Sequence, residues 1–268
     1  MTLDLAALTA TWPVGSSAVA VVTARSTTTS TGDGVCYPWA SVTKIATALT
    51  VLDAAADGVV DLGDQVGPPG STLAHVLAHA AGLGASEGQQ LSPVGTRRTY
   101  CNHGYELAAG HVARAAGRPF EVELTERVLA PIGMSATVLS GSPAHGLIGP
   151  IEDLARLGAE LLAPRVLQPE IVTQASTVAF PGLSGVLPGY GRQDHNDWGL
   201  GCEIRGHKRP HWTAAENSPA TFGHFGQSGS FVWVDRAAGL ACASLADTPF
   251  GPWAVAAWPV LSSAVLAG

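Results

Sequence analysis

The sequence predicts a mixed α/β fold of the α+β type, with a mostly antiparallel sheet flanked by helices and an inserted all-α region. Three observations lead to this prediction. A short β-branched run lies near the N-terminus, strand patterns return only after residue 198, and the interval between them shows helical periodicity. We expect one domain over residues 1–268, its sheet formed from about residues 14–40 and 198–268 and its helical region from about 41–197.

The period of the apolar residues predicts the individual elements. Ser17–Thr23 is rich in valine and alanine and is predicted to be a buried strand. A helix is predicted from Ser41, where apolar residues recur at steps of three and four, and Gly58 supplies its C-terminal stop. Further helices are expected over residues 71–80, 105–116, 119–129, 152–162 and 252–266.

The last third of the chain carries the remaining strand signals. Residues 198–204, 229–235 and 240–246 are predicted strands, and the turn residues 236–239 join the last two into an antiparallel hairpin. Residues 181–197 are expected to form a long loop. A crevice between the sheet and the helical region is the natural place for a site.

Composition excludes several classes of protein. The chain has 268 residues, of which 46% are hydrophobic and 13% charged, and its formal net charge is −7. These values favour neither a disordered chain nor a nucleic-acid-binding surface. The four cysteines lie far apart without a Cys-x-x-Cys pair, so we expect free thiols rather than a disulfide framework or a zinc site.

The sequence also lacks the signals of a membrane or exported protein. No segment reaches the roughly 18 apolar residues of a membrane span. The first ten residues contain an acid, Asp4, and no basic residue, which is not typical of a signal peptide. We expect a cytoplasmic protein without membrane or nucleic-acid partners, and the sequence leaves its oligomeric state open.

His75 and His79 are spaced four apart and could present two metal ligands on one helical face. No acidic third ligand is close in the sequence. The pair is therefore interpreted as part of a capped, packed helix, and we expect no metal site.

Ser41 and Lys44 place a hydroxyl and an amine one helical turn apart. A serine hydroxyl is a poor nucleophile unless a base removes its proton, and an amine can serve only when burial depresses its pKa. Lysine is scarce here, because 12 of the 14 basic residues are arginine and only Lys44 and Lys208 remain. Lys208 lies in the polar segment 205–209 and could be replaced by arginine without obvious loss, whereas arginine at position 44 could not release a proton.

Two further motifs follow Ser41-x-x-Lys44 in the chain. Tyr100-Cys-Asn102 precedes a predicted helix, and the segment 222–229, Phe-Gly-His-Phe-Gly-Gln-Ser-Gly, runs into a predicted strand. Together the three resemble the motif signature of the serine β-lactamase and penicillin-binding-protein superfamily. The Tyr-x-Asn and His-x-Gly forms resemble the class C β-lactamase branch and its esterase relatives. The resemblance extends from about Ser17 to the C-terminal helix and implies a β-lactamase/transpeptidase-like fold.

The resemblance also implies a role for each motif residue. Ser41 would be the acylated nucleophile, Lys44 its proton acceptor or electrostatic partner, and Tyr100 the second member of the base system. Which of Lys44 and Tyr100 is the effective base stays open. The remaining residues would bind substrate: Asn102 would hold Lys44 and a substrate oxygen, His224, Phe225 and Gly226 would line a strand edge, and the N–H groups of Gln227 and Ser41 would form an oxyanion hole. Gly226 is expected because a side chain would block the substrate's approach to the backbone.

Phe225 departs from the pattern of the Lys-Thr-Gly enzymes, which have a hydroxyl beside a cation at this place. Phenylalanine cannot donate a hydrogen bond, and His224 is a weaker, pH-dependent cation than lysine. Strong recognition of a substrate carboxylate is therefore not expected. A cytoplasmic location also favours a small ester or amide over a cell-wall peptide.

The sequence thus predicts a serine hydrolase that forms an acyl-enzyme at Ser41 on small esters or amides and needs no metal or organic cofactor. One alternative keeps the mechanism and changes the substrate, to a β-lactam, a D-alanyl-D-alanine peptide or a D-amino-acid amide. Another alternative is a non-catalytic binding protein with the same fold.

Overall fold

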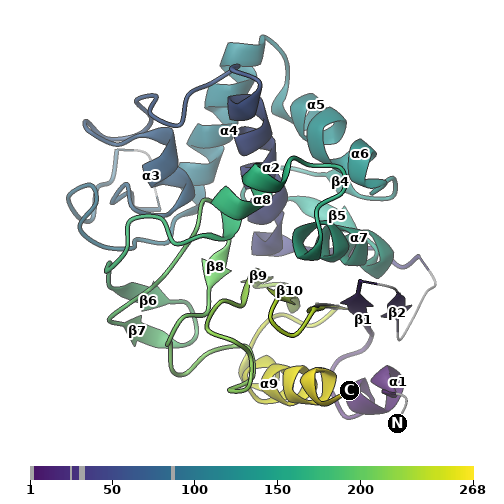
Figure 1. Cartoon of the computed structure of the whole chain (residues 1–268). Helices are drawn as coiled ribbons and strands as arrows, with labels where there is room; N and C mark the ends of the chain where they lie inside the picture. The colour runs from purple at the N-terminus through teal and green to yellow at the C-terminus, as the bar shows by residue number, and fades with distance from the viewer. Residues whose placement is uncertain (1–2, 25, 30–33, 86–87) are drawn as a thin grey trace.

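The computed structural model describes residues 3–24, 26–29, 34–85 and 88–268 (Figure 1). At its centre is a six-stranded sheet in the order β2-β1-β11-β10-β9-β8. Its strands are β1 (Ser17–Thr23), β2 (Thr27–Thr29), β8 (Glu203–Ile204), β9 (Phe222–Gly226), β10 (Ser230–Asp235) and β11 (Leu240–Ala246). Every neighbouring pair is antiparallel, which confirms the predicted kind of sheet.

The two ends of the chain meet in this sheet. β1 pairs with β11 along its whole length, from Ser17 opposite Ala246 to Thr23 opposite Leu240. β10 and β11 form the predicted hairpin, whose turn is fixed by the carboxylate of Asp235 accepting from the N–H groups of Ala237 and Ala238.

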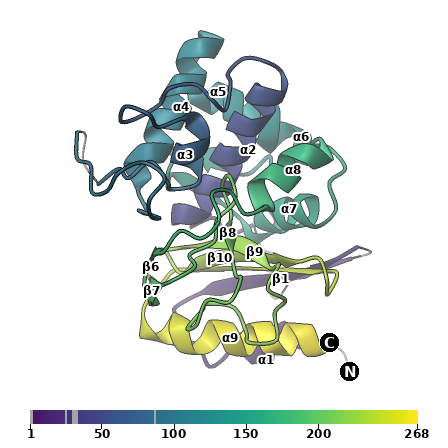
Figure 2. The same ribbon diagram turned by 60° about the vertical axis from the view of Figure 1, so that its left-hand side comes forward.

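Helices cover both faces of the sheet (Figure 2). α1 (Leu5–Thr9) and α9 (Pro252–Ala267) lie on one face. The opposite face carries η1 (Ala40–Val42), α2 (Thr43–Ala56), α3 (Leu73–Leu77), α4 (Asn102–Ala116), α5 (Phe120–Leu124), η2 (Thr125–Leu129), α6 (Ala130–Ile132), α7 (Ile151–Leu162) and α8 (Pro169–Ser176). Because strand side chains alternate, Val19 and Val21 of β1 join the core with α9, whereas Ala20 and Val22 join the core on the other face.

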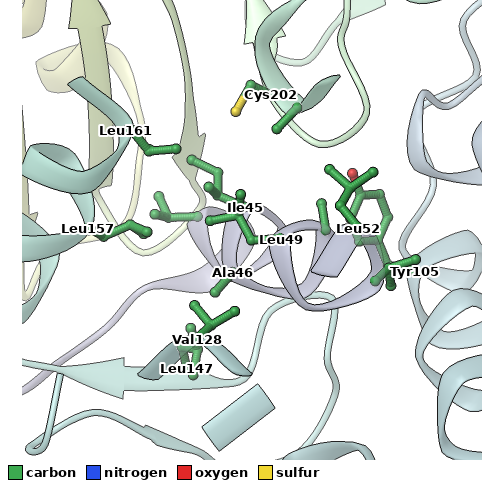
Figure 3. Packing of buried hydrophobic residues seen from close by; sticks show 14 of the residues in the cluster. Ile45, Ala46, Leu49, Leu52, Tyr105, Val128, Leu147, Leu157, Leu161 and Cys202 are labelled. Atoms are coloured by element: carbon green, nitrogen blue, oxygen red, sulfur yellow. The ribbon is translucent and has the colours of Figure 1, made fainter. Parts of the chain in front are cut away.

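α2 is the central helix of the larger core. All of its residues from Thr43 to Leu52 are buried, as expected for a helix that is apolar or small on every side. Figure 3 shows Leu157 and Leu161 of α7 and Tyr105 of α4 gathered around it. This burial fixes the axis of the helix that carries Lys44.

Several predicted elements differ in extent from those in the structure. The helix predicted over residues 71–80 is only α3, and the second half of the helix at 119–129 is the π-helical η2. Only Glu203–Ile204 of the strand predicted over 198–204 is extended. The chain turns after α2 at Gly58, whose φ of +73° suits the predicted stop.

The helical region is not purely α. It includes the hairpin of β6 (Gly185–Leu187) and β7 (Gly191–Gln193), within the predicted long loop. β4 (Val138–Leu139) and β5 (Leu147–Gly149) form a small sheet with β3 (Tyr37–Pro38). Among the described residues, no helix is both long and apolar enough to cross a membrane.

Candidate active site

Ser41 lies in the short turn between β3 and α2. The preceding residue, Ala40, has a φ of +44°, a left-handed conformation that is costly for a residue with a side chain. Trp39 is fully buried and its indole N–H donates to the carbonyl of Gly149 at 3.1 Å. From the central sheet, the hydroxyl of Ser230 donates to the carbonyl of Trp39 at 2.7 Å. The turn is therefore held from both sides.

Lys44 is fully buried, one turn along from Ser41. Its Nζ donates to Asn102 Oδ1 at 2.6 Å and to the carbonyl of Ala144 at 2.8 Å, and it lies 3.2 Å from Ser41 Oγ. Burial lowers the pKa of Lys44 to about 7, which the nearby Cys101 and Glu106 only partly offset. The amine is thus poised between its two protonation states near neutral pH.

Asn102 begins α4, and Tyr100 lies two residues before it in the chain. The amide oxygen of Asn102 is the partner of Lys44. The Tyr100 ring centroid lies 5.0 Å from Lys44 Nζ. Burial raises the pKa of Tyr100 well above its usual range, despite the opposing effect of a hydrogen bond with Ser41. The phenol is consequently protonated at neutral pH.

β9 supplies the third motif. The backbone turn that follows it is fixed to the Ser41 turn, because Ser228 Oγ donates to the carbonyl of Pro38 at 2.7 Å. The backbone of Gln227 is fixed by a hydrogen bond, in which the N–H of Phe250 donates to the Gln227 carbonyl at 2.9 Å. A Cβ at Gly226 would lie 2.5 Å from the Trp39 carbonyl oxygen and 2.9 Å from Ala40 Cβ. The close approach of β9 to the Ser41 turn therefore requires glycine at this position, whatever its role toward substrate.

The sequence suggested that His224 is a weak, pH-dependent cation, but its surroundings in the structure favour the neutral ring. It is 3% exposed, and burial together with the charge of Lys44 lowers its pKa to about 3. Its Nδ1 lies 2.6 Å from the carbonyl oxygen of Phe225, which can only accept, so Nδ1 carries the proton. The ring is neutral at physiological pH.

A small cavity of about 30 Å³ joins these residues. Five of the predicted site residues line it: Ser41, Tyr100, His224, Phe225 and Gln227. Lys44 and Asn102 do not line it, but Lys44 contacts both Ser41 and Asn102. Sequence reasoning did not assign the other lining residues to the site, and these are Leu187, Pro188, Trp198 and Glu203. It also could not have found the carbonyl of Ala144, because a backbone acceptor leaves no mark on residue type.

The cavity has apolar walls. Phe225 packs against Tyr190 and Phe250, with ring centroids 5.9 and 5.0 Å apart, and Trp198 lies 5.3 Å from His224. Phe225 thus presents a ring where a hydrogen-bonding side chain would serve a charged substrate.

His75 and His79 do not share a helical face. α3 ends at Leu77, and His79 lies beyond it with a φ of +55°. His75 completes the N-terminal capping box of α3 with Thr72, and the Nδ1 of His79 accepts from the N–H of Cys101 at 3.3 Å. The His79 ring also packs 4.6 Å from that of Tyr100, so both histidines have structural contacts.

The interpretation of Lys208 as readily replaced by arginine is wrong. Lys208 is 2% exposed, and its ammonium is paired with the carboxylate of Glu203 while also donating to the carbonyls of Asp197 and Ile204. The larger, planar guanidinium of arginine does not match this compact cage of three acceptors. Burial would raise the pKa of Glu203, but the charges of Lys208 and His211 lower it below its usual range.

Comparisons with known proteins agree with this architecture. A family model described as Beta-lactamase matches residues 14–265. A solved structure of a β-lactamase from Mycobacterium bovis is 46% identical, with a TM-score of 0.95 over 97% of each chain. No curated protein matches the sequence.

More distant solved structures share the fold at low identity. A simvastatin synthase variant from Aspergillus terreus is 16% identical, with a TM-score of 0.79 over 98% of this chain and 93% of its own. A D-alanine carboxypeptidase from Burkholderia cenocepacia is 17% identical, with a TM-score of 0.75 over 98% and 96%. With the predicted sheet, the assembled motifs and the family match in agreement, the chain belongs to the β-lactamase family.

Proposed function

We propose that this protein is a serine hydrolase that forms an acyl-enzyme at Ser41 and acts on small esters or amides. The surroundings of Lys44 carry the proposal. A neutral amine has two N–H donors and one lone pair, and the carbonyl oxygens of Asn102 and Ala144 take both donors. The lone pair is left for the third neighbour, Ser41 Oγ at 3.2 Å, as a general base requires.

The reaction follows from this arrangement. Ser41 Oγ attacks the substrate carbonyl carbon while its proton passes to Lys44 Nζ, and the N–H groups of Ser41 and Gln227 stabilise the oxyanion. As the bond to the leaving group breaks, the leaving group takes a proton from Lys44 directly or through the Tyr100 hydroxyl. Water then attacks the acyl-enzyme, releases the acid and restores Ser41.

Replacement of the nucleophile tests the proposal. Ser41→Ala is expected to lower turnover of p-nitrophenyl butyrate by about a thousandfold or more, because no covalent route remains. Ser135→Ala, which removes an exposed hydroxyl, is the matched control and should keep full activity. Undiminished turnover by Ser41→Ala would overturn the proposal.

A second candidate keeps the mechanism but acts on β-lactams, D-alanyl-D-alanine peptides or D-amino-acid amides. The 46% identity to a protein described as a β-lactamase favours it. Rapid hydrolysis of a chromogenic cephalosporin, or a stable penicilloyl adduct on Ser41 by intact mass, would promote this candidate over the ester hydrolase.

A non-catalytic binding protein on the same fold would not need a reactive serine. Labelling with a fluorophosphonate, followed by intact mass, separates this possibility from both hydrolases. We expect one adduct, absent from Ser41→Ala. Lack of labelling in the folded wild-type protein would favour the binding protein.

A further inference from the structure

The buried His224 ring, which lines the cavity, carries a hydrogen-bond acceptor that no other described residue uses. With the proton on Nδ1, the neutral ring carries a lone pair on Nε2. Among the described residues, buried Nε2 has no hydrogen-bond partner. The ring itself lines the cavity, between the Tyr100 and Trp198 rings at 5.8 and 5.3 Å. A buried acceptor without a partner is costly unless a ligand supplies the donor.

The groups around His224 make it an acceptor rather than a cation. Lys44 and His79 face it from the helical side, and the positive charge of Lys44 disfavours a second positive charge nearby. Glu203 is the acidic group on the sheet side, but Lys208, His211 and the Trp212 indole already engage its oxygens. Its carboxylate does not reach His224 as an ion-pair partner in the described part of the chain.

No cationic side chain lines the cavity among the residues that the structure describes. Lys44 lies behind Ser41 and is committed to Asn102 and Ala144, and Lys208 is paired with Glu203. Arg98, the next buried base, donates to the carbonyls of residues 78, 179, 180 and 196. A substrate carboxylate would therefore enter a low-dielectric space beside Glu203 without a lining cation to pair with directly, which is unfavourable.

We infer that His224 determines specificity for an uncharged substrate that donates a hydrogen bond, from a hydroxyl or an amide N–H, to its Nε2. This inference rests on the proposed hydrolase and narrows its substrate class. It predicts that methylation of the donor lowers kcat/KM for the substrate. A carboxylate at the same place is predicted to lower kcat/KM further.

Two matched pairs of esters test the inference. One pair varies the acyl group and the other varies the leaving group. On the acyl side, p-nitrophenyl 3-hydroxybutyrate is compared with its 3-methoxy analogue, and p-nitrophenyl hemisuccinate supplies the carboxylate. On the leaving-group side, the butyrate ester of 4-acetamidophenol is compared with that of its N-methyl derivative. In at least one pair, we expect the donor to raise kcat/KM about tenfold, a usual effect of one buried hydrogen bond. The hemisuccinate is expected to be the poorest of the acyl-side substrates.

Variants at His224 show whether the preference comes from this ring. In the pair of esters whose rates differ for the wild type, His224→Leu should bring the ratio of their kcat/KM values to about one. His224→Gln keeps an acceptor oxygen and should retain part of the preference for the donor. A merely structural role would lower both members of a pair together and leave their ratio unchanged. Thermal melting checks that each variant is folded, and the wild-type ratios are decisive even if one is not.

The outcomes separate this inference from the proposed function. Equal rates within both pairs for the wild type, an unchanged ratio in His224→Leu, or a preference for the hemisuccinate would overturn the role of His224 while leaving the hydrolase intact. Failure of the wild type to hydrolyse any of the esters, or full activity in Ser41→Ala, would overturn the hydrolase itself.

Discussion

At the scale of single residues, the environment of Lys44 predicts the pH dependence of the reaction. The pKa of about 7 means that the amine gains its lone pair as the pH rises through neutrality. Activity on p-nitrophenyl butyrate should therefore be low near pH 5, half-maximal near pH 7 and constant above about pH 8. Initial rates followed at the isosbestic wavelength of the nitrophenol product give this profile as kcat/KM.

Lys44→Arg is the informative partner of that measurement. Arginine keeps the positive charge but cannot release its proton at any accessible pH, so the variant should be inactive across the whole range. If activity instead stayed flat from pH 5 to 9, or if Lys44→Arg retained it, Lys44 would act as an electrostatic partner and not as the base.

Residue identity alone could predict the motif residues, but neither the other residues that line the cavity nor the protonation states. Ser41, Lys44, Tyr100 and Asn102 were recognisable because their order and spacing carry a motif. The neutral state of His224 depends on its burial and on the Phe225 carbonyl, which no pattern of residue types records. The same holds for Lys208, whose carboxylate partner Glu203 lies on a strand only two residues long.

At the scale of elements, Lys208 attaches the segment after β8 to that strand. The buried Glu203 carboxylate would lose its main counter-charge in Lys208→Met, and we expect the free energy of unfolding to fall by about 3 to 5 kcal/mol. Chemical denaturation followed by fluorescence measures the change. Arg209→Met removes an exposed basic side chain next to it and should change stability by less than about 0.5 kcal/mol. Equal effects of the two substitutions would mean that the ion pair contributes nothing.

The elements that sequence could predict are the longer ones. β1, β10, β11, α2, α7 and α9 were expected close to where they lie, because each runs for at least six residues and is either mostly apolar or small throughout or, as in α7, amphipathic. Two- and three-residue strands such as β3 and β6 are too short to show any period. They exist because neighbouring segments bring a partner strand alongside.

At the scale of the whole molecule, the sheet and the helical region meet closely at the Ser41 turn. Gly226 of β9 lies against Trp39 and Ala40, and an added Cβ would be 2.5 Å from Ser230 Oγ and from the Trp39 carbonyl oxygen. Neither backbone can move without shifting the turn, because Ser230 also donates to Trp39. Gly226→Ala should therefore lower stability by about 1 to 3 kcal/mol and activity by about a hundredfold, since a displacement near 1 Å misaligns the nucleophile.

Gly158→Ala is the matched control for that prediction. Gly158 lies within α7, on the same face of the sheet, and its added Cβ would make ordinary contacts of 3.6 Å with Ala241 and Val232. Alanine also favours a helix over glycine by up to about 1 kcal/mol, so this variant should be as stable as the wild type or more so, with unchanged activity. Thermal melts and ester hydrolysis measured on both variants decide the matter. If Gly226→Ala behaved like Gly158→Ala, the two layers would not be in rigid contact at the Ser41 turn, and its geometry would have to be maintained from within the helical region alone.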